Sequence, residues 1–370
     1  MKILISGHNG FIGKHLLRKL KCVNLDYETE FLTRSDFKSP YSLAKKISSD
    51  DIIFHFAGVN RDIDENEVFL KNNEINETLY LALGEVNFKG KLIFTSSTQE
   101  NTESLYGKAK KDARLKFEKQ SNSLGYFFSG IITPNIFGPF CKPNYNSFIA
   151  TFSYNIINKQ IPKVDQNKSV SLIYIGDFID LIIRALYNND PIKINNELIQ
   201  NFKVNDILNK LNNFNDSYIL KGHIPSFESY FDLCLFNTFR SYIEYENFFP
   251  INHQVYIDGR GSFSELTRCF SEGQTSYSVT KKGITRGNHF HTRKVERFSV
   301  ISGKAKISIR EVLSEKKIEF FLDGDRPSYV DMPIWYTHNI ENIGDDDLIT
   351  MFWINEHYNE DSPDTYLENV

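Results

Sequence analysis

Two histidines placed two residues apart are the feature that most constrains the fold of this chain. His289 and His291 lie in the stretch 283–303. On an extended strand, residues i and i+2 project from the same face, so both imidazoles can reach one metal ion, and Glu296 can add a carboxylate after a short bend. A further ligand has to come from another strand, and His338 is the obvious supplier. The pattern therefore predicts a metal site built on β-strands.

The alternative is that His289 and His291 are ordinary, partly buried strand residues, which is the usual role of an isolated histidine. The metal itself is not fixed by the sequence. Three nitrogen ligands and one oxygen ligand suit Zn²⁺, but another divalent metal such as Ni, Mn or Fe is also compatible with this set.

The composition is that of a globular protein with room for two domains. The chain has 370 residues, of which 41% are hydrophobic and 24% are charged. A net charge of −4 without a basic stripe argues against nucleic acid as a partner. The four cysteines form no Cys-x-x-Cys pair, which is typical of free thiols in a reducing compartment. No stretch resembles a signal peptide or a membrane span, so we expect a cytoplasmic protein without a membrane partner.

The start of the chain predicts a dinucleotide-binding turn. An apolar run at 3–5 is followed by Gly-x-x-Gly-x-x-Gly and then by a helical pattern of apolar residues. Glycines between a strand and a helix let the backbone turn tightly and approach a pyrophosphate, which then lies at the helix N-terminus. The residues expected to contact the cofactor in this turn are Gly7, Gly10, Phe11, Ile12 and Gly13.

Further cofactor contacts are expected at the ends of the next two strands. The second strand, predicted over 29–33, ends beside Arg34, which can pair with a 2′-phosphate and so favours NADP. The alternative is that Arg34 is a solvated surface residue. A buried strand over 51–56 ends in Ala57 and Gly58, which are small enough for a cofactor to cross, and the following helix carries Asn72.

A tyrosine and a lysine four residues apart predict catalytic chemistry. Tyr106 and Lys110 lie on one helix face. The ammonium is expected to lower the pKa of the phenol and to make it a proton donor near neutral pH. The preceding strand, predicted over 92–94 and the residues after it, ends near Ser97, the third expected catalytic residue.

Together these residues resemble the extended short-chain dehydrogenase/reductases that act on nucleotide sugars. The glycines match the family's turn, and Ser97, Tyr106 and Lys110 match its catalytic set. The segment 133–139 resembles the family's substrate-binding segment and makes Asn135 a substrate contact, although Ile132 replaces an arginine that many members carry. The resemblance implies an α/β Rossmann-like doubly wound parallel sheet over residues 1–246, the NADP-binding reductase domain.

The remainder, residues 247–370, is predicted to be a second, all-β domain. From residue 255 onward, short strands alternate with turn residues. The spacings Gly-x5-His-x-His-x4-Glu-x6-Gly and Pro-x4-His-x3-Asn resemble the two motifs of the cupins, which are jelly-roll barrels. In the second motif Trp335 replaces the usual glycine. The resemblance implies a metal-binding epimerase domain.

The segments 258–265 and 283–289 resemble the cupin-fold 3,5-epimerases of deoxysugar synthesis. His291 stands where those enzymes usually have glutamine. The resemblance makes Arg260, Glu265 and Arg286 candidate contacts to the diphosphate or the sugar, although each could instead form a surface ion pair. Tyr336 and Lys281 are both possible general bases.

With the reductase first and the cupin second, the chain resembles the CapF-type family of bifunctional enzymes of capsular polysaccharide and O-antigen synthesis. The likeness runs along the whole chain and includes the segments 58–61, 141–152 and 355–366. It implies that the cupin epimerises C3 of UDP-2-acetamido-2,6-dideoxy-4-hexulose and that the reductase then reduces the C4 ketone with NADPH. The product would be UDP-2-acetamido-2,6-dideoxy-β-L-talose, on the route to UDP-N-acetyl-L-fucosamine. The resemblance also implies a homodimer with zinc in the cupin.

Two other functions are compatible with the same residues. One is a nucleotide-sugar epimerase or dehydratase that retains NAD(P) and uses the cupin only structurally. It is disfavoured because Thr98 and Gln99, rather than an acid, follow Ser97. The other is a dinucleotide-sensing protein without enzymatic activity, which is disfavoured because both Tyr106 and Lys110 are present.

Overall fold

The computed structural model describes residues 1–23, 27–60 and 64–370. Arg61, at the end of one segment that carries the family resemblance, lies outside the described residues. The chain divides into two compact units. The first comprises Met1–Thr151 and Val164–Val204, and the second comprises Phe152–Lys163 and Asn205–Val370.

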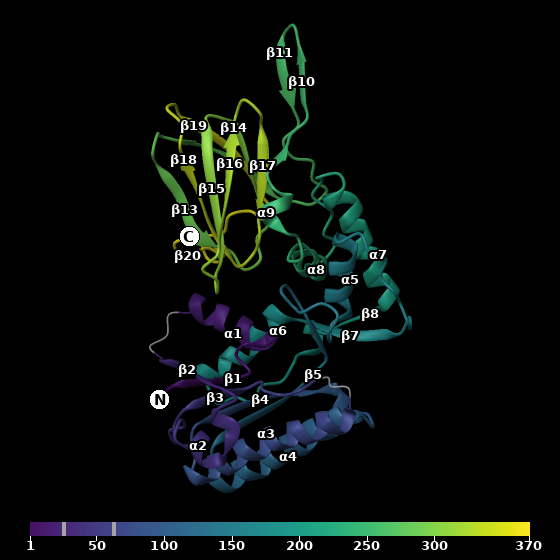
Figure 1. Cartoon of the computed structure of the whole chain (residues 1–370), viewed down its shortest axis with the longest axis vertical. Helices are drawn as coiled ribbons and strands as arrows, with labels where there is room; N and C mark the ends of the chain where they lie inside the picture. The colour runs from purple at the N-terminus through teal and green to yellow at the C-terminus, as the bar shows by residue number, and fades with distance from the viewer. Residues whose placement is uncertain (24–26, 61–63) are drawn as a thin grey trace. The chain divides into compact units, whose positions relative to one another are not determined.

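The first unit is built on a five-stranded parallel sheet in the order β2-β1-β3-β4-β5 (Figure 1). Leu4, Ile53 and Leu92 are fully buried in adjacent strands, because a parallel sheet is covered on both faces. The strand order reverses between β1 and β3, which is where ligands bind in sheets of this type. The strands are β1 (Ile3–Ser6), β2 (Thr29–Leu32), β3 (Ile52–His55), β4 (Lys91–Ser97) and β5 (Phe127–Thr133).

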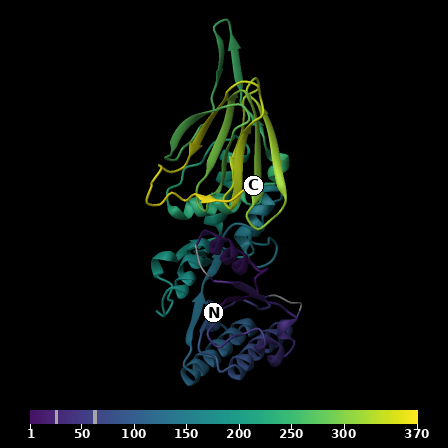
Figure 2. The ribbon, with the colours of Figure 1, turned by 90° about the vertical axis from the view of Figure 1, so that its left-hand side faces the viewer.

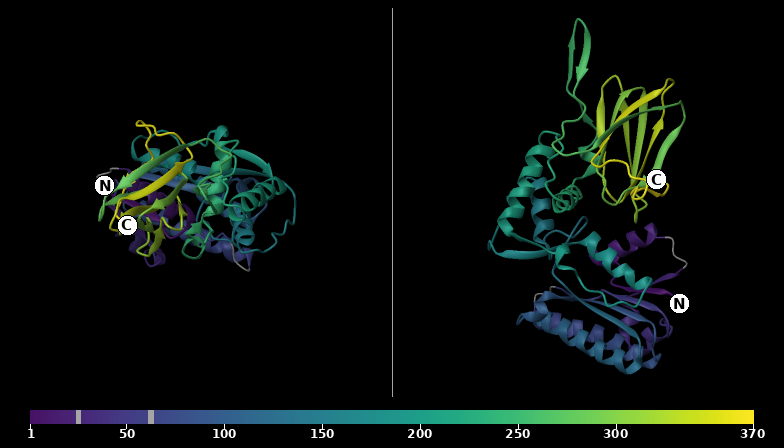
Figure 3. Two further views of the ribbon diagram at one scale, coloured as in Figure 1. Left: turned by 90° about the horizontal axis from the view of Figure 1, so that it is seen from above. Right: turned by 180° about the vertical axis from the view of Figure 1, so that it is seen from behind.

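Helices cover both faces of this sheet (Figures 1 and 3). Helix α3 packs along α4 on one face, and α1 packs along α6 on the other. Helix α4 begins after Ser104, whose Oγ accepts a hydrogen bond from the Gly107 amide at 3.1 Å, and ends at Gly125 with a φ of +80°. Within the described residues, no helix is both long enough and apolar enough to cross a bilayer. The helices are α1 (Phe11–Cys22), α2 (Pro40–Ala44), α3 (Glu65–Glu85), α4 (Leu105–Leu124) and α6 (Ile175–Ile182).

The chain after β5 forms a small three-stranded sheet and then a helical segment. The sheet has the order β6-β7-β8, with β6 (Asn135–Phe137), β7 (Ser169–Tyr174) and β8 (Gln200–Lys203). The helices of this part are α5 (Phe148–Ile157), α7 (Val204–Phe214), α8 (Tyr230–Arg240) and α9 (Tyr245–Phe248).

The second unit contains two five-stranded sheets that face each other, as Figure 2 shows, and a separate hairpin of β10 and β11. The sheet orders are β12-β19-β14-β17-β9 and β16-β15-β18-β13-β20. This antiparallel double sheet confirms the predicted cupin-like fold. The strands are β9 (Ile251–Asn252), β10 (Val255–Asp258), β11 (Gly261–Ser264), β12 (Gln274–Thr280), β13 (Thr285–Phe290), β14 (Glu296–Ser302), β15 (Lys304–Glu311), β16 (Lys317–Asp323), β17 (Ser328–Met332), β18 (Tyr336–Asn342), β19 (Leu348–Ile354) and β20 (Tyr366–Leu367).

Helices α7 and α8 belong to the second unit, although we predicted that the reductase domain extends to residue 246. A buried polar network explains this difference. Arg297 on β14 pairs with Asp331 on β17 through two bonds of 2.8 and 2.9 Å. The hydroxyl of Tyr218 donates to the same carboxylate at 2.7 Å, and Arg240 of α8 donates to the Met332 carbonyl at 3.0 Å. These groups are all buried, so the helical segment completes the core of the second unit.

Candidate active and metal sites

The glycine turn lies at the reversal point of the parallel sheet. Its five predicted residues, Gly7, Gly10, Phe11, Ile12 and Gly13, occupy the junction of β1 and the first turn of α1. Gly7 has a φ of +71°, and a Cβ there would lie 2.8 Å from the backbone nitrogen of Ala57. A Cβ on Gly13 would lie 2.4 Å from the carbonyl oxygen of Gly7. Both positions therefore require glycine, and the turn leaves the amide end of α1 open to an anion.

A buried histidine that the sequence analysis did not consider ties the ends of β1 and β3 together. The ring of His55 contacts the Ser6 hydroxyl through Nδ1 at 2.6 Å and Asn76 Oδ1 through Nε2 at 3.0 Å. Ser6 Oγ also accepts hydrogen bonds from the amides of Phe56 and Ala57, each at 3.1 Å. Burial lowers the pKa of His55 to about 3, so the ring is neutral. The backbone beside the glycine turn is thereby fixed.

Asn72, Gly58 and Lys110 lie together beside the end of β3. The Asn72 side chain accepts from the Val59 amide at 3.2 Å and donates to the Val59 carbonyl at 2.7 Å. A Cβ on Gly58 would lie 2.8 Å from Asn72 Oδ1 and 3.5 Å from Lys110 Nζ. Lys110 Nζ donates to the Thr95 carbonyl at 3.1 Å. The structure thus brings three of the predicted cofactor residues together.

Tyr106 and Lys110 share one face of α4, but the predicted effect on the tyrosine pKa is wrong. Burial raises the pKa of Tyr106 to about 12, and Lys110 Nζ lies 5.9 Å from the ring centre. Burial also lowers the pKa of Lys110 to about 8, because the ammonium has lost most of its water. Ser97 lies at the end of β4, where its Oγ accepts from the Gln99 amide at 3.2 Å.

A buried acid that the sequence analysis overlooked follows the end of β4. The Glu100 carboxylate accepts hydrogen bonds from Arg114 Nε and Nη2 at 2.9 and 2.8 Å, and Ser96 Oγ also donates to it. Arg114 neutralises this carboxylate, so Glu100 is not a free acid beside Ser97. The structure therefore agrees with the argument against a dehydratase, although for a different reason.

The remaining predicted residues of the first unit lie on its surface. Arg34 is exposed, two residues beyond β2. The carboxylate of Asp36 lies at the same strand end and accepts from the Thr33 amide at 2.7 Å. Asn135 is exposed on β6 and donates to the Ser171 carbonyl at 3.3 Å. The strand end thus carries an acid, Asp36, as well as Arg34.

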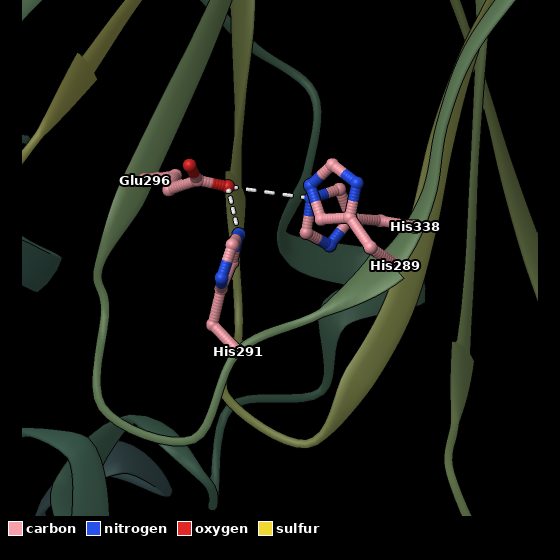
Figure 4. A group of neighbouring side chains, drawn as sticks. All are labelled: His289, His291, Glu296 and His338. Carbon is pink, nitrogen blue, oxygen red and sulfur yellow. Dashed lines mark ion pairs between the residues drawn. The ribbon is translucent and has the colours of Figure 1, made fainter. Parts of the chain in front are cut away.

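The four predicted metal ligands converge inside the second unit, as Figure 4 shows. His289 is the penultimate residue of β13, and His291 directly follows that strand. Glu296 starts β14, and His338 lies on β18 directly opposite His289. His291 Nε2 and His338 Nε2 lie 3.0 and 3.3 Å from Glu296 Oε2. One ligand atom from each residue lies within 4.8 Å of all the others. His291, Glu296 and His338 are buried, and His289 is partly buried.

The chemistry of this cluster fits a divalent cation. The Nε2 atoms of His291 and His338 and Oε2 of Glu296 are buried without a hydrogen bond of good geometry, despite their short separations. Burial alone would raise the pKa of Glu296, but the charges and contacts of His291 and His338 hold it well below its usual range. The pKa of His289 is lowered to about 4, mainly by burial and to a smaller extent by His338 and His291. Burial alone would lower the pKa of His291, but the Glu296 carboxylate and the Asp364 carbonyl raise it, so a metal that binds the neutral ring would displace a proton.

The turn before His338 tolerates the unusual Trp335 of the second motif. Trp335 has a φ of +62°, a left-handed conformation that favours glycine. Its ring is buried and packs 5.8 Å from Phe290, and its amide donates to the His291 carbonyl at 2.7 Å. Packing and this hydrogen bond therefore hold the turn in the conformation that a glycine would adopt freely.

Two of the three predicted sugar contacts and both candidate general bases have other partners. Arg260 pairs with Asp258 at 2.6 Å in the hairpin, and Glu265 pairs with Arg268 at 2.7 Å. Arg286 is exposed on β13. The two candidate bases are also engaged: Lys281 is exposed and pairs with Asp347 at 2.7 Å, and the Tyr336 ring stacks on Tyr245 at 5.9 Å.

The fold and the two sites define a dinucleotide-binding enzyme of the short-chain dehydrogenase type joined to a cupin-like domain. The profile of the NAD dependent epimerase/dehydratase family matches residues 3–198, and that of the polysaccharide biosynthesis C-terminal domain matches residues 256–366. With full-length relatives above 30% identity, the chain belongs to the CapF-type family, which combines these two domains.

Two full-length relatives carry this assignment. The UDP-2-acetamido-2,6-beta-L-arabino-hexul-4-ose reductase of Pseudomonas aeruginosa is 31% identical over 100% of this chain and 99% of its own. The capsular polysaccharide assembling protein CapF of Staphylococcus aureus is 32% identical, with both chains fully covered and a TM-score of 0.62. A shorter match, at 24% identity over 29% of this chain and 78% of its own, is to the spore coat polysaccharide biosynthesis protein SpsL of Bacillus subtilis.

Proposed function

We propose that the chain is a bifunctional nucleotide-sugar enzyme of capsule or O-antigen synthesis. The second unit epimerises C3 of UDP-2-acetamido-2,6-dideoxy-4-hexulose. The first unit then reduces the C4 ketone with NADPH to UDP-2-acetamido-2,6-dideoxy-β-L-talose, on the route to UDP-N-acetyl-L-fucosamine. The observation that carries the proposal is the end-to-end likeness to a reductase whose name specifies such a 4-keto sugar. Since UDP-sugars and NADPH are cytoplasmic metabolites, we place the reaction in the cytoplasm.

The reduction requires a proton for the carbonyl oxygen, and Tyr106 is the residue placed to donate it. Its high pKa keeps the phenol protonated at neutral pH, so the proton is present when the oxygen needs it. NADPH, when bound, supplies the hydride for the ketone carbon. Lys110 holds a positive charge beside the tyrosine and Gly58, and Ser97 adds a hydroxyl at the end of the neighbouring strand.

The epimerisation requires stabilisation of negative charge on the ketone oxygen while the C3 proton is removed. A divalent ion, Zn²⁺ or another divalent metal, would supply a Lewis acid when bound. The residues that would hold it are His289, His291, Glu296 and His338. The order of the two reactions follows from chemistry, because reduction of the ketone removes the acidity of the C3 proton.

The test is NADPH absorbance after the protein is mixed with the UDP-linked 4-keto sugar, with NADH as the comparison cofactor. We expect oxidation of NADPH in stoichiometry with the sugar. Tyr106→Phe is expected to abolish reduction and to retain deuterium exchange at C3 in ²H₂O. The double change of His289 and His338 to alanine is expected to abolish this exchange and, when supplied with ketone already epimerised by Tyr106→Phe, to retain reduction. If either folded variant lost both activities in these assays, the division of labour would be refuted.

The same measurement separates the alternatives. An enzyme that retains its cofactor would convert the sugar without net loss of NADPH, and a sensing protein would bind the cofactor and convert nothing. The ion pair of Glu100 with Arg114 disfavours a dehydratase, since it engages the acid that follows Ser97 by three residues.

We further propose a homodimer. The hairpin of β10 and β11 exposes the side chains of Tyr256, Ile257 and Phe263, and a two-stranded hairpin alone is only marginally stable in water. These apolar side chains support a second copy of the chain as the covering surface. We expect light scattering to give twice the chain mass for the wild type and a smaller mass for Phe263→Ser.

A further inference from the structure

Asp364, near the end of the chain, binds the loop that joins two metal ligands. Its side chain is fully buried, and its φ of +43° is one that few residues adopt. The carboxylate accepts from three successive amides, those of Thr292 at 3.0 Å, Arg293 at 3.0 Å and Lys294 at 3.2 Å. Thr292 Oγ1 adds a fourth donor at 2.7 Å. One carboxylate therefore holds three of the four residues between His291 and Glu296.

The backbone of the same residue sets the state of His291. The carbonyl oxygen of Asp364 lies 2.5 Å from His291 Nδ1 and can only accept, so Nδ1 carries the hydrogen. The lone pair of the neutral ring is then on Nε2, the atom that faces Glu296 Oε2 at 3.0 Å. His338 has a weaker arrangement, since its Nδ1 lies 3.2 Å from the carbonyl of Tyr336 on its own strand. His291 is thus oriented from a residue 73 positions away.

The loop and the C-terminal segment are joined at further points. Arg293 pairs with Glu356 at 2.9 Å and donates to the Ser362 carbonyl at 2.8 Å, and Lys294 Nζ donates to the Pro363 carbonyl at 2.5 Å. These contacts lie at the periphery, whereas those of Asp364 reach the ligand itself. The remaining amide of the loop, that of Val295, donates to Asn355 Oδ1 at 2.7 Å.

We infer that Asp364 is a positioning residue of the metal site. Its carboxylate holds the loop 292–294, and its carbonyl fixes the tautomer of His291 in which Nδ1 carries the hydrogen and Nε2 is free to bind the metal. This inference rests on the metal binding in the proposed function. Partners of this kind outside the ligand set typically change metal affinity by about 10- to 100-fold when they are removed.

The test is the matched pair Asp364→Asn and Asp361→Asn, with Co²⁺ and Zn²⁺ as probes. Asparagine keeps the shape and tolerates a positive φ, but its amide nitrogen would face amide donors of the loop. We expect Asp364→Asn to bind both ions about 10-fold or more weakly, in competition with a chelator, and to alter the visible absorption of bound Co²⁺. Asp361 is exposed three residues away, so Asp361→Asn should match the wild type.

Two results would overturn the inference: Asp364→Asn binding both ions as the wild type does, or an equal loss in Asp361→Asn. Should Asp364→Asn fail to fold, ¹⁵N spectra of the Zn²⁺-loaded wild type decide the matter. We expect hydrogen on Nδ1 of His291 and metal on Nε2, and metal on Nδ1 would refute the assignment. A wild type that binds neither ion would instead refute the metal site of the proposed function.

Discussion

Lys110 occupies a position where its charge is unfavourable for folding, so we expect Lys110→Met to stabilise the first unit. Burial lowers the pKa of this lysine from 10.5 to about 8. At about 1.4 kcal/mol per pKa unit, the charged form destabilises the fold by roughly 3 kcal/mol at neutral pH. Methionine keeps the apolar stem but loses the hydrogen bond to the Thr95 carbonyl, which offsets about 1 kcal/mol. The expected net gain in the free energy of unfolding is about 2 kcal/mol.

The pH dependence of this gain has a definite sign. Below pH 8 the lysine is charged in the folded and the unfolded chain, and the wild type carries the full penalty. Between pH 8 and 10.5 the unfolded chain binds the proton more tightly, so the stability of the wild type rises with pH relative to the variant. Above this range the lysine is neutral in both states, and the advantage of the variant disappears.

Urea unfolding without cofactor, followed by far-ultraviolet ellipticity, measures the effect. Both tryptophans, Trp335 and Trp353, lie in the second unit, so their fluorescence provides an internal control that should not change. Lys111→Met, at an exposed neighbouring position, is the matched variant and should have little effect. The reasoning would be refuted if Lys110→Met were less stable than the wild type at pH 7, or if the difference were the same at pH 7 and pH 10.

Three further predictions concern the turn, the buried ion pair and the metal. A Cβ on Gly13 would lie 2.4 Å from a carbonyl oxygen, so Gly13→Ala should weaken NADPH binding at least about 10-fold in a fluorescence titration, whereas Gly84→Ala, with no atom closer than 3.7 Å, should not. Asp331→Asn leaves Arg297 buried without its counter-charge and should lower the free energy of unfolding by about 3 to 5 kcal/mol, measured by tryptophan fluorescence. Chelation of the loaded protein should lower the melting temperature of the tryptophan transition and leave NADPH binding intact, and an unchanged melting temperature would contradict a metal in this cluster.

Features that depend on neighbours in the sequence could be predicted well. The glycine turn follows directly from a strand, three glycines and a helix, and the structure has all three in place. The convergence of the four candidate ligands was also predicted, because period-two spacing brings His289 and His291 to one face and family motifs supply Glu296 and His338. The turn at Trp335 agrees with the motif even though the usual glycine is absent.

Features that depend on distant contacts or on burial could not be predicted. The phenol of Tyr106 has a raised pKa because of its burial, which a spacing of four residues does not reveal. The unit boundary depends on a hydrogen bond from Tyr218 to Asp331, which are 113 positions apart. Asp364 meets the ligand loop across more than 70 positions, and its neighbours in the sequence give no sign of this role.

The helices that pack on the cupin-like sheets limit how this protein can be divided. A fragment starting at residue 247 would keep Arg297 and Asp331 but lose the phenol of Tyr218 and the arginine of α8. Arg297 and Asp331, which are buried in the whole chain, would lose part of the cover that this helical segment provides. Exchange of the cupin-like part between relatives therefore has to include the segment from residue 205 onward, well before the residues matched by the C-terminal family profile.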